Sequence, residues 1–151
     1  MSVETILAAA DRIRPFIRRT PVIKLEHCAG AQLPEEFYLK LECLQVSGSF
    51  KVRGAVNRVK TLEPEKLKNG LVAASGGNYG LATAYMAKQS GVPATIFLPT
   101  NASPLKEQKL KNWGADVRYA GAVWDEAHEA AQAFSAKSGA FYMHPFADDA
   151  I

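Results

Sequence analysis

Cysteine is scarce in this sequence. Among its 151 residues only Cys28 and Cys43 are cysteines, and no CxxC spacing occurs, so a disulfide scaffold or a cysteine-bound zinc site is not expected. No apolar run approaches the ~20 residues that a membrane-spanning helix needs. The start of the chain, where Glu4 and Asp11 bracket a short apolar stretch with no basic segment before it, does not resemble a signal peptide. These absences predict a protein of the reducing cytoplasm with no membrane contact.

Charge of one sign is also lacking. The net charge is +3, the charged fraction is 22% and the hydrophobic fraction is 48%, all close to the values of ordinary soluble globular proteins. Disorder and nucleic-acid binding are therefore not expected. The densest basic run is interpreted as a solvated helix face and the turn after it, with an anion or partner contact as the alternative. This run consists of Arg12, Arg14, Arg18 and Arg19.

Residue types that often bind ligands are interpreted here as structural. His27, His128 and His144 show no ligand spacing, so no metal site is predicted. Trp113 and Trp124 are expected in the core or at an interface.

The spacing of apolar residues predicts an alternation of helices and strands. An amphipathic helix is expected at the start of the chain, and Pro15 should end or kink it. Further helices are expected over residues 51–62, 78–89, 103–113 and 123–137. Strands are expected over residues 22–25, 37–41, 71–74, 94–98, 116–119 and 140–143. The alternation from about Lys51 onward predicts an α/β fold with an open parallel sheet flanked by helices on both faces.

Two breaks rich in glycine and serine, over residues 47–51 and 75–79, each lie between a predicted strand and a predicted helix. In an open parallel sheet, ligands bind at the carboxyl ends of the strands, where such loops lie. In the second break, Gly76 and Gly77 would let the backbone approach a ligand closely, and Ser75 adds a hydroxyl. This chemistry suits a carboxylate or phosphate, but it also suits an ordinary helix cap at Ser75 or Asn78.

Lys51 begins the helix expected over residues 51–62, which is an unfavourable place for a cation. An amine whose charged form is disfavoured is the kind that forms Schiff bases. The alternative is a surface lysine whose aliphatic stem covers Phe50. Taken alone, the residues leave both interpretations open.

Together, the two breaks resemble those of the fold-type II pyridoxal-phosphate (PLP) enzymes. Tyr-Leu-Lys-Leu-Glu at 38–42, Gly-Ser-Phe-Lys at 48–51 and Arg-Gly-Ala at 53–55 are similar to the threonine/serine dehydratases. Further shared pieces are Arg-Thr-Pro at 19–21, Gly-Val-Pro-Ala-Thr at 91–95 and His-Pro-Phe at 144–146. The resemblance covers essentially the whole chain and is to the N-terminal half of these longer enzymes.

The resemblance implies a role for each residue of the two breaks. Lys51 would carry PLP as a Schiff base and move protons at the substrate Cα, with Phe50 packed beside the cofactor ring. Asn78 would hydrogen-bond the ring hydroxyl oxygen of the cofactor. The substrate carboxylate would be bound, mostly through backbone N–H groups, by Ser75, Gly76, Gly77, Asn78 and Tyr79.

The implied reaction is the β-elimination of L-threonine or L-serine to a 2-oxo acid and ammonia by the full-length form. The implied fold is the small domain of the tryptophan synthase β-like PLP fold, over residues 52–144. Residues 1–51 would be an N-terminal part of the large PLP domain, and residues 145–151 the start of the return to it. A homodimer or higher homo-oligomer is expected. The glycine-rich loop for the cofactor phosphate would lie beyond residue 151, so this chain alone is expected to bind PLP poorly.

Two positions in the second break depart from the family pattern. Tyr79 stands where many dehydratases have histidine, which leaves the choice between threonine, serine and other substrates open. Gly76 stands where racemases have a second serine, and glycine cannot transfer a proton, so racemisation is disfavoured. A β-replacement enzyme of the cysteine-synthase kind remains an alternative, and so does a non-catalytic fragment.

Overall fold

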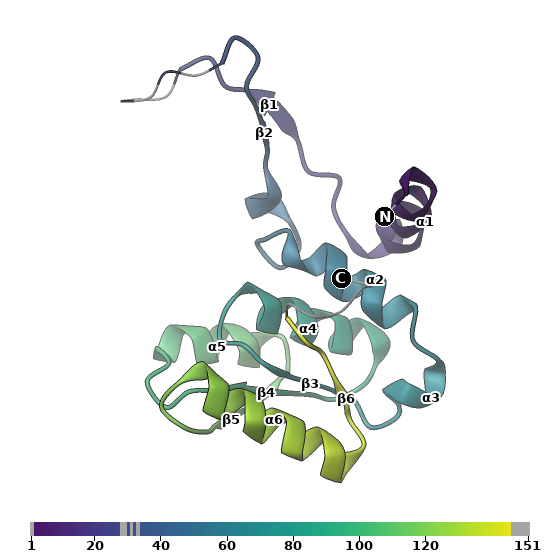
Figure 1. The fold of residues 1–151 in the computed structure, drawn as a ribbon, viewed down its shortest axis with the longest axis vertical. Coiled ribbons are helices and arrows are strands. Elements are labelled where there is room, and N and C mark those ends of the chain that lie inside the picture. The colour runs from purple at the N-terminus through teal and green to yellow at the C-terminus, as the bar shows by residue number, and fades with distance from the viewer. Residues whose placement is uncertain (1, 28–29, 31, 33, 146–151) are drawn as a thin grey trace.

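The computed structural model of the chain describes residues 2–27, 30, 32 and 34–145. Its centre is a four-stranded sheet in the order β5-β4-β3-β6 in which all paired strands are parallel (Figure 1). The strands are β3 (Leu71–Ala74), β4 (Ala94–Leu98), β5 (Asp116–Tyr119) and β6 (Phe141–Tyr142). The predicted open parallel sheet is confirmed. Of these four strands only β6 is shorter than predicted, and outside this sheet the strands predicted over 22–25 and 37–41 are also one or two residues shorter.

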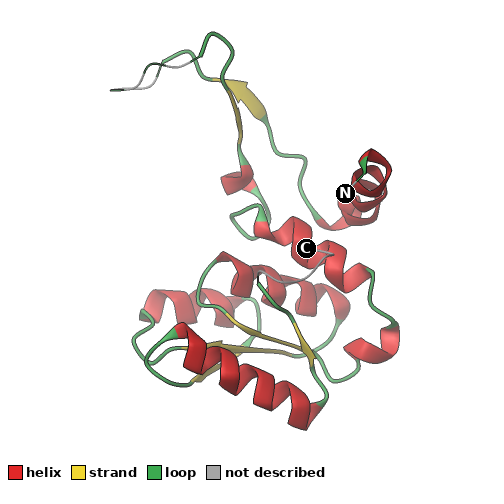
Figure 2. Cartoon of the chain, viewed as in Figure 1, coloured by secondary structure: helices red, strands yellow, loops and turns green. Residues whose placement is uncertain are grey.

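Helices cover both faces of this sheet, as Figure 2 shows. Two of them, α4 (Asn78–Ser90) and α5 (Pro104–Asn112), pack on one face, and α6 (Trp124–Ser138) packs on the other. A further helix, α2 (Lys51–Lys60), packs against α4. Their ends differ from the predicted ones by a residue or two. The short helix α3 (Pro64–Leu67), which the sequence analysis missed, connects α2 to β3.

The burial of β3 explains its continuous apolar sequence. Leu71 and Ala73 belong to the core on the α4 side, whereas Val72 and Ala74 belong to the core on the α6 side. Successive side chains of a strand point to opposite faces, and both faces are covered here. Helix α4 ends at Gly91, whose φ of 68° is a left-handed value that suits glycine.

The residues before α2 form further elements, of which the first helix packs against α2 and places Ile13 in the main core. Helix α1 (Val3–Ile13) is followed by a 3-10 turn, η1 (Arg14–Phe16), that contains Pro15, so the predicted end of the first helix is confirmed. Strands β1 (Val22–Lys24) and β2 (Tyr38–Lys40) pair with each other in antiparallel fashion. A second 3-10 turn, η2 (Glu42–Leu44), leads toward α2.

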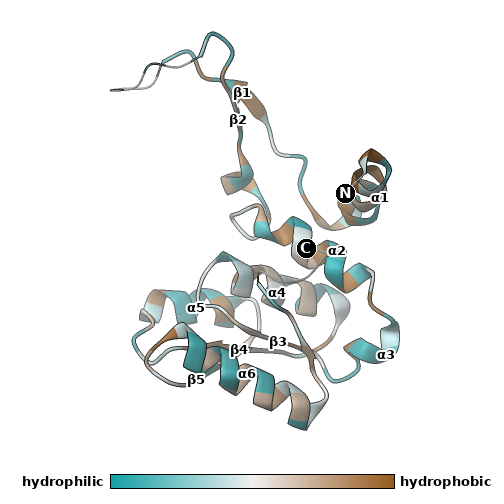
Figure 3. Cartoon of the chain, in the orientation of Figure 1, coloured by the Kyte–Doolittle hydropathy of each residue, from teal (hydrophilic) through white to brown (hydrophobic). Residues whose placement is uncertain are grey.

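Apolar side chains of these N-terminal elements are exposed. Val3 is 66% exposed, Leu7 is 60% exposed and Val22 is 58% exposed. Figure 3 shows α1 and β1 as largely hydrophobic ribbons outside the packed sheet and its helices. Within the part of the chain that the structure describes, no helix is long and apolar enough to cross a membrane.

Candidate functional site

Lys51 is the first residue of α2 and follows a tight loop. Gly48 turns this loop with a φ of 78°, and its amide donates to the Gln45 carbonyl oxygen at 2.8 Å. The Lys51 Nζ lies 5.2 Å from the centre of the Phe50 ring. That ring is exposed. The amine therefore lies beside an accessible aromatic ring at the start of α2. This position fits a lysine that forms a Schiff base, and it also fits a surface lysine whose stem covers Phe50.

The same loop contains two buried serine hydroxyls. Ser47 is 8% exposed and Ser49 is 6% exposed. Neither Oγ has a hydrogen-bond partner among the described residues. A buried hydroxyl without a partner is costly, so such groups in a native protein often serve a bound group or an ion. Both hydroxyls belong to the loop that leads into Lys51, so they are candidates to bind a polar group there.

The second loop joins the end of β3 to the start of α4. The Ser75 Oγ accepts a hydrogen bond from the Gly77 amide at 3.3 Å. Gly77 is the N-cap residue of α4, and no side chain caps the helix. The interpretation of Ser75 or Asn78 as an ordinary helix cap is therefore wrong. Asn78 is exposed in the first turn of α4, where backbone N–H groups lack helical partners and could bind an anion.

Two residues where this loop continues into α4, Tyr79 and Gly80, are buried. A Cβ atom on Gly80 would lie 2.0 Å from the Ser75 carbonyl oxygen, so the absence of a side chain lets the loop lie directly on α4. Tyr79 is 3% exposed and its side chain belongs to the core. The side chain therefore does not line an exposed site, and the expectation that the Tyr79 backbone N–H binds a carboxylate stays a prediction.

The fold brings the two loops to the same side of the molecule. Helices α2 and α4 pack against each other and begin on the same side in Figure 1. Ser47, from the loop before α2, and Leu81, from the first turn of α4, line one cavity of about 390 Å³. Lys51 and Asn78 are thus the first residues of two helices that begin side by side.

An ion pair that the sequence analysis missed fixes the start of α2. Arg53 donates to both carboxylate oxygens of Glu42, at 2.8 and 2.7 Å, and the Thr20 hydroxyl donates to the same carboxylate at 2.5 Å. The Arg53 hydrogen bonds hold the pKa of Glu42 below its usual value, and Glu42 in turn raises the pKa of Arg53. Glu42 and Arg53 both belong to the sequence strings that resemble the dehydratases. Their place in these strings was the signal from which a role for the two residues could have been predicted.

Trp124 is another residue whose role the sequence did not reveal. It was expected only in the core or at an interface, but its indole N–H donates to the Ala74 carbonyl oxygen at 2.8 Å. Ala74 is the last residue of β3, directly before the 75–79 loop. Trp124 therefore contacts the backbone from which the candidate binding loop departs.

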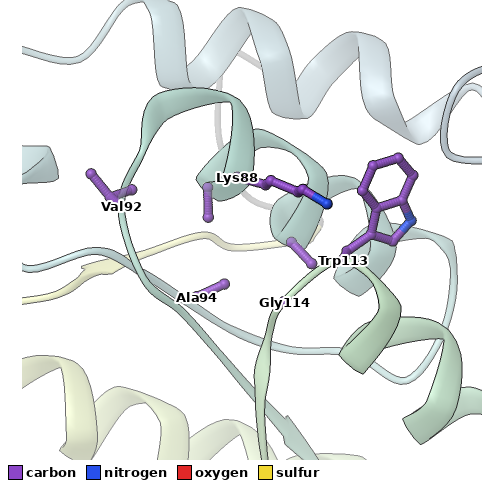
Figure 4. A pocket seen from close by; sticks show the side chains of 7 residues that line it. Lys88, Val92, Ala94, Trp113 and Gly114 are labelled. Carbon is purple, nitrogen blue, oxygen red and sulfur yellow. The ribbon is translucent and has the colours of Figure 1, made fainter.

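Other cavities lie away from the predicted site residues. One of about 230 Å³ lies at the end of α4 and is lined by Lys88, Trp113 and small neighbours (Figure 4). Another, of about 440 Å³, is lined by α1 and several cations of the basic run. Among the described residues, no cluster of histidine, cysteine, aspartate and glutamate could hold a metal ion.

Known proteins resemble this chain in sequence and in structure. The family described as "Pyridoxal-phosphate dependent enzyme" matches residues 13–151. An L-threonine ammonia-lyase of Thermotoga maritima is 48% identical over 151 residues, which cover 98% of this chain and 37% of that protein. The L-threonine dehydratase catabolic TdcB of Staphylococcus aureus is 37% identical over 148 residues, which cover 98% of this chain and 43% of that protein.

Solved structures agree. A threonine deaminase described as from T.th. has a TM-score of 0.87 and 35% identity over 99% of this chain and 47% of that one. Maize serine racemase has a TM-score of 0.86 and 30% identity over 99% of this chain and 45% of that one. The chain thus spans less than half the length of these relatives. By its sequence and its fold, the chain belongs to the family of pyridoxal-phosphate dependent enzymes.

Proposed function

We propose that this chain forms the N-terminal part of a PLP-dependent ammonia-lyase that converts L-threonine or L-serine into a 2-oxo acid and ammonia. The observation that supports it most directly is the position of Lys51 and the 75–79 loop at the starts of two packed helices. The names of the similar proteins, L-threonine ammonia-lyase and L-threonine dehydratase, favour threonine as the first substrate to test.

In this proposal, Lys51 holds the cofactor through its amine and Asn78 donates to the ring hydroxyl oxygen. When bound, PLP supplies an electron sink that stabilises negative charge at the substrate Cα. Once the substrate amine has displaced it from the cofactor, the Lys51 amine would take the Cα proton, and the β-hydroxyl group would leave with a proton as water. Hydrolysis of the dehydrated product by water would then give 2-oxobutanoate from threonine or pyruvate from serine, each with ammonia. The backbone amides of Gly77 and Tyr79 and the Ser75 hydroxyl orient the substrate carboxylate.

Racemisation is the less favoured alternative. A serine in place of Gly76 would have its Cβ 3.1 Å from Leu98 Cδ2 and 3.4 Å from Lys106 Cδ. The Leu98 side chain would have to give by a few tenths of an ångström, and the Lys106 contact is an ordinary one, so the structure itself does not exclude a serine. Glycine carries no group that transfers a proton, and this supports elimination over racemisation at the present loop.

We further propose that the full-length protein works in amino-acid metabolism in the cytoplasm, as a homodimer or higher homo-oligomer without a nucleic-acid or membrane partner. The mild net charge of +3 supports the absence of a nucleic-acid partner, and the exposed apolar side chains of α1 and β1 support self-association.

The test uses the longest protein that carries this chain, incubated with PLP and then with L-threonine or L-serine. We expect production of 2-oxo acid and ammonia, and a loss of at least ~10²-fold in the Lys51→Ala variant, because a positioned base contributes about that much or more. Lys66→Ala, at an exposed lysine of α3, is the matched control and should keep full activity. A product that forms only with an added thiol would identify β-replacement instead, and undiminished activity of Lys51→Ala would contradict the proposal.

A further inference from the structure

The pairing of β6 with β3 ends at a proline. The Phe141 amide donates to the Gly70 carbonyl oxygen and the Met143 amide donates to the Val72 carbonyl oxygen, each at 2.8 Å. The next donor in this alternation would be the amide of residue 145, opposite the Ala74 carbonyl. Residue 145 is proline, which has no N–H. The ladder therefore cannot supply a donor to the last carbonyl of β3.

The Trp124 side chain supplies that donor. Its Nε1 lies 2.8 Å from the Ala74 carbonyl oxygen, and Ala74 is fully buried. Because water cannot easily reach a buried carbonyl, the loss of this donor would leave a polar group without a partner. The bond joins the first residue of α6 to the end of a strand 50 positions earlier in the chain.

The indole ring is itself held in place by its neighbours. The His128 ring stacks on it with centroids 4.8 Å apart and planes inclined by 17°. The His128 Nδ1 lies 2.5 Å from the Tyr142 hydroxyl oxygen, which ties α6 to β6. Burial raises the pKa of Tyr142 to about 12, so this phenol stays protonated near neutral pH. The ring cluster therefore restricts the direction in which the Trp124 N–H can point.

We propose that Trp124 is a positioning residue for the 75–79 loop, in which its indole N–H replaces the backbone donor that Pro145 lacks. Ser75 directly follows Ala74, whose carbonyl oxygen Trp124 binds, and the Ser75 carbonyl oxygen lies against Gly80 of α4. The backbone of the loop is thus fixed at both of these points. The consequence of this fixed backbone for catalysis rests on the proposed function, in which the loop binds the substrate carboxylate.

The first test is structural and needs no cofactor. Trp124→Phe keeps an aromatic ring for stacking but removes the N–H, and Trp113→Phe is the same substitution at a tryptophan that packs edge-on against Tyr85. Amide hydrogen exchange is measured in the chain at residues 75–77. In Trp124→Phe we expect exchange about threefold to tenfold faster, the range that one lost hydrogen bond allows. Trp113→Phe should leave exchange at these amides unchanged.

A compensating substitution separates the lost hydrogen bond from general damage. Pro145→Ala restores a backbone N–H opposite the Ala74 carbonyl, so the double variant Trp124→Phe/Pro145→Ala should recover most of the lost protection. Pro145→Ala alone should resemble the unchanged chain at residues 75–77. Equal exchange in Trp124→Phe and Trp113→Phe, or a double variant no better than Trp124→Phe, would overturn the proposal.

The functional test uses the longest active protein that carries this chain. Trp124→Phe should raise the KM for the amino acid about threefold to tenfold with little change in kcat, because a displaced loop weakens carboxylate binding. If the exchange results hold and KM does not change, Trp124 positions the loop but the loop does not bind the carboxylate, and the proposed function loses that role. If the exchange results fail, the positioning role is refuted whatever the activity.

Discussion

Gly80 lies where the 75–79 loop passes closest to α4. A Cβ atom there would be 2.0 Å from the Ser75 carbonyl oxygen, which belongs to the backbone and cannot turn away. In Gly80→Ala, overpacking should lower the free energy of unfolding by about 1–3 kcal/mol, despite the higher helix propensity of alanine. Urea unfolding measures the change. Gln89→Ala, at an exposed position of the same helix, is the control, and a Gly80→Ala variant as stable as this control would contradict the close approach.

Single residues of the site were predictable only in part. Lys51 and Asn78 could be named as candidates because each lies in a short string of distinctive residues at the start of a predicted helix. The structure confirms these helix starts, and the roles of the two residues stay predictions. The burial of Tyr79 and the bond from Trp124 to Ala74 could not be predicted. Each depends on a contact between residues far apart in the sequence, and local patterns carry no information about such contacts.

At the scale of elements, the Glu42–Arg53 pair joins η2 to α2. The Glu42 side chain is 16% exposed and accepts two hydrogen bonds from Arg53. Glu42→Gln should lower the free energy of unfolding at pH 7 by about 1.5–3 kcal/mol, the range for hydrogen bonds to a charged group. The control is Glu65→Gln, which removes an exposed ion pair with Lys68 and should change the free energy of unfolding little.

The same pair predicts a dependence on pH. The folded-state pKa of Glu42 is lowered below its ordinary value of 4.5, chiefly by the Arg53 hydrogen bonds. Its stabilisation is therefore fully present above pH 4.5 and is lost as the pH falls through the lowered pKa. The stability difference between the unchanged chain and Glu42→Gln should shrink over that acidic range. A difference that stays constant from pH 7 to pH 3 would show that the charge of Glu42 has no part in it.

Most elements followed from the sequence because apolar spacing and turn residues are local signals. Strands β3, β4 and β5 have the predicted ends, and the helices differ by a residue or two. The short elements α3 and η2 were missed because a single turn shows no periodicity. Strand β6 is shorter than predicted because its apolar run does not show where its pairing with β3 stops.

At the scale of the whole molecule, the packed sheet and its helices contrast with the N-terminal elements. The β1–β2 pair is a two-stranded ribbon with exposed apolar residues, and such pairs are marginal without further packing. The division at about residue 51 remains a prediction. Limited trypsin digestion of this chain should cleave first after Lys24 or Lys40, and later after Lys109 or Lys111 in α5, although all four are exposed. First cleavage within α5 would contradict this order.

The identity of the residue that holds the cofactor is the claim on which the proposed function depends. The direct measurement is to incubate the longest protein that carries this chain with PLP, reduce it with borohydride, and locate the labelled lysine by peptide mass mapping. We expect the label on Lys51, and its loss in Lys51→Ala but not in Lys66→Ala. Label on another lysine, or an equal spread over the surface lysines, would contradict the assignment of Lys51.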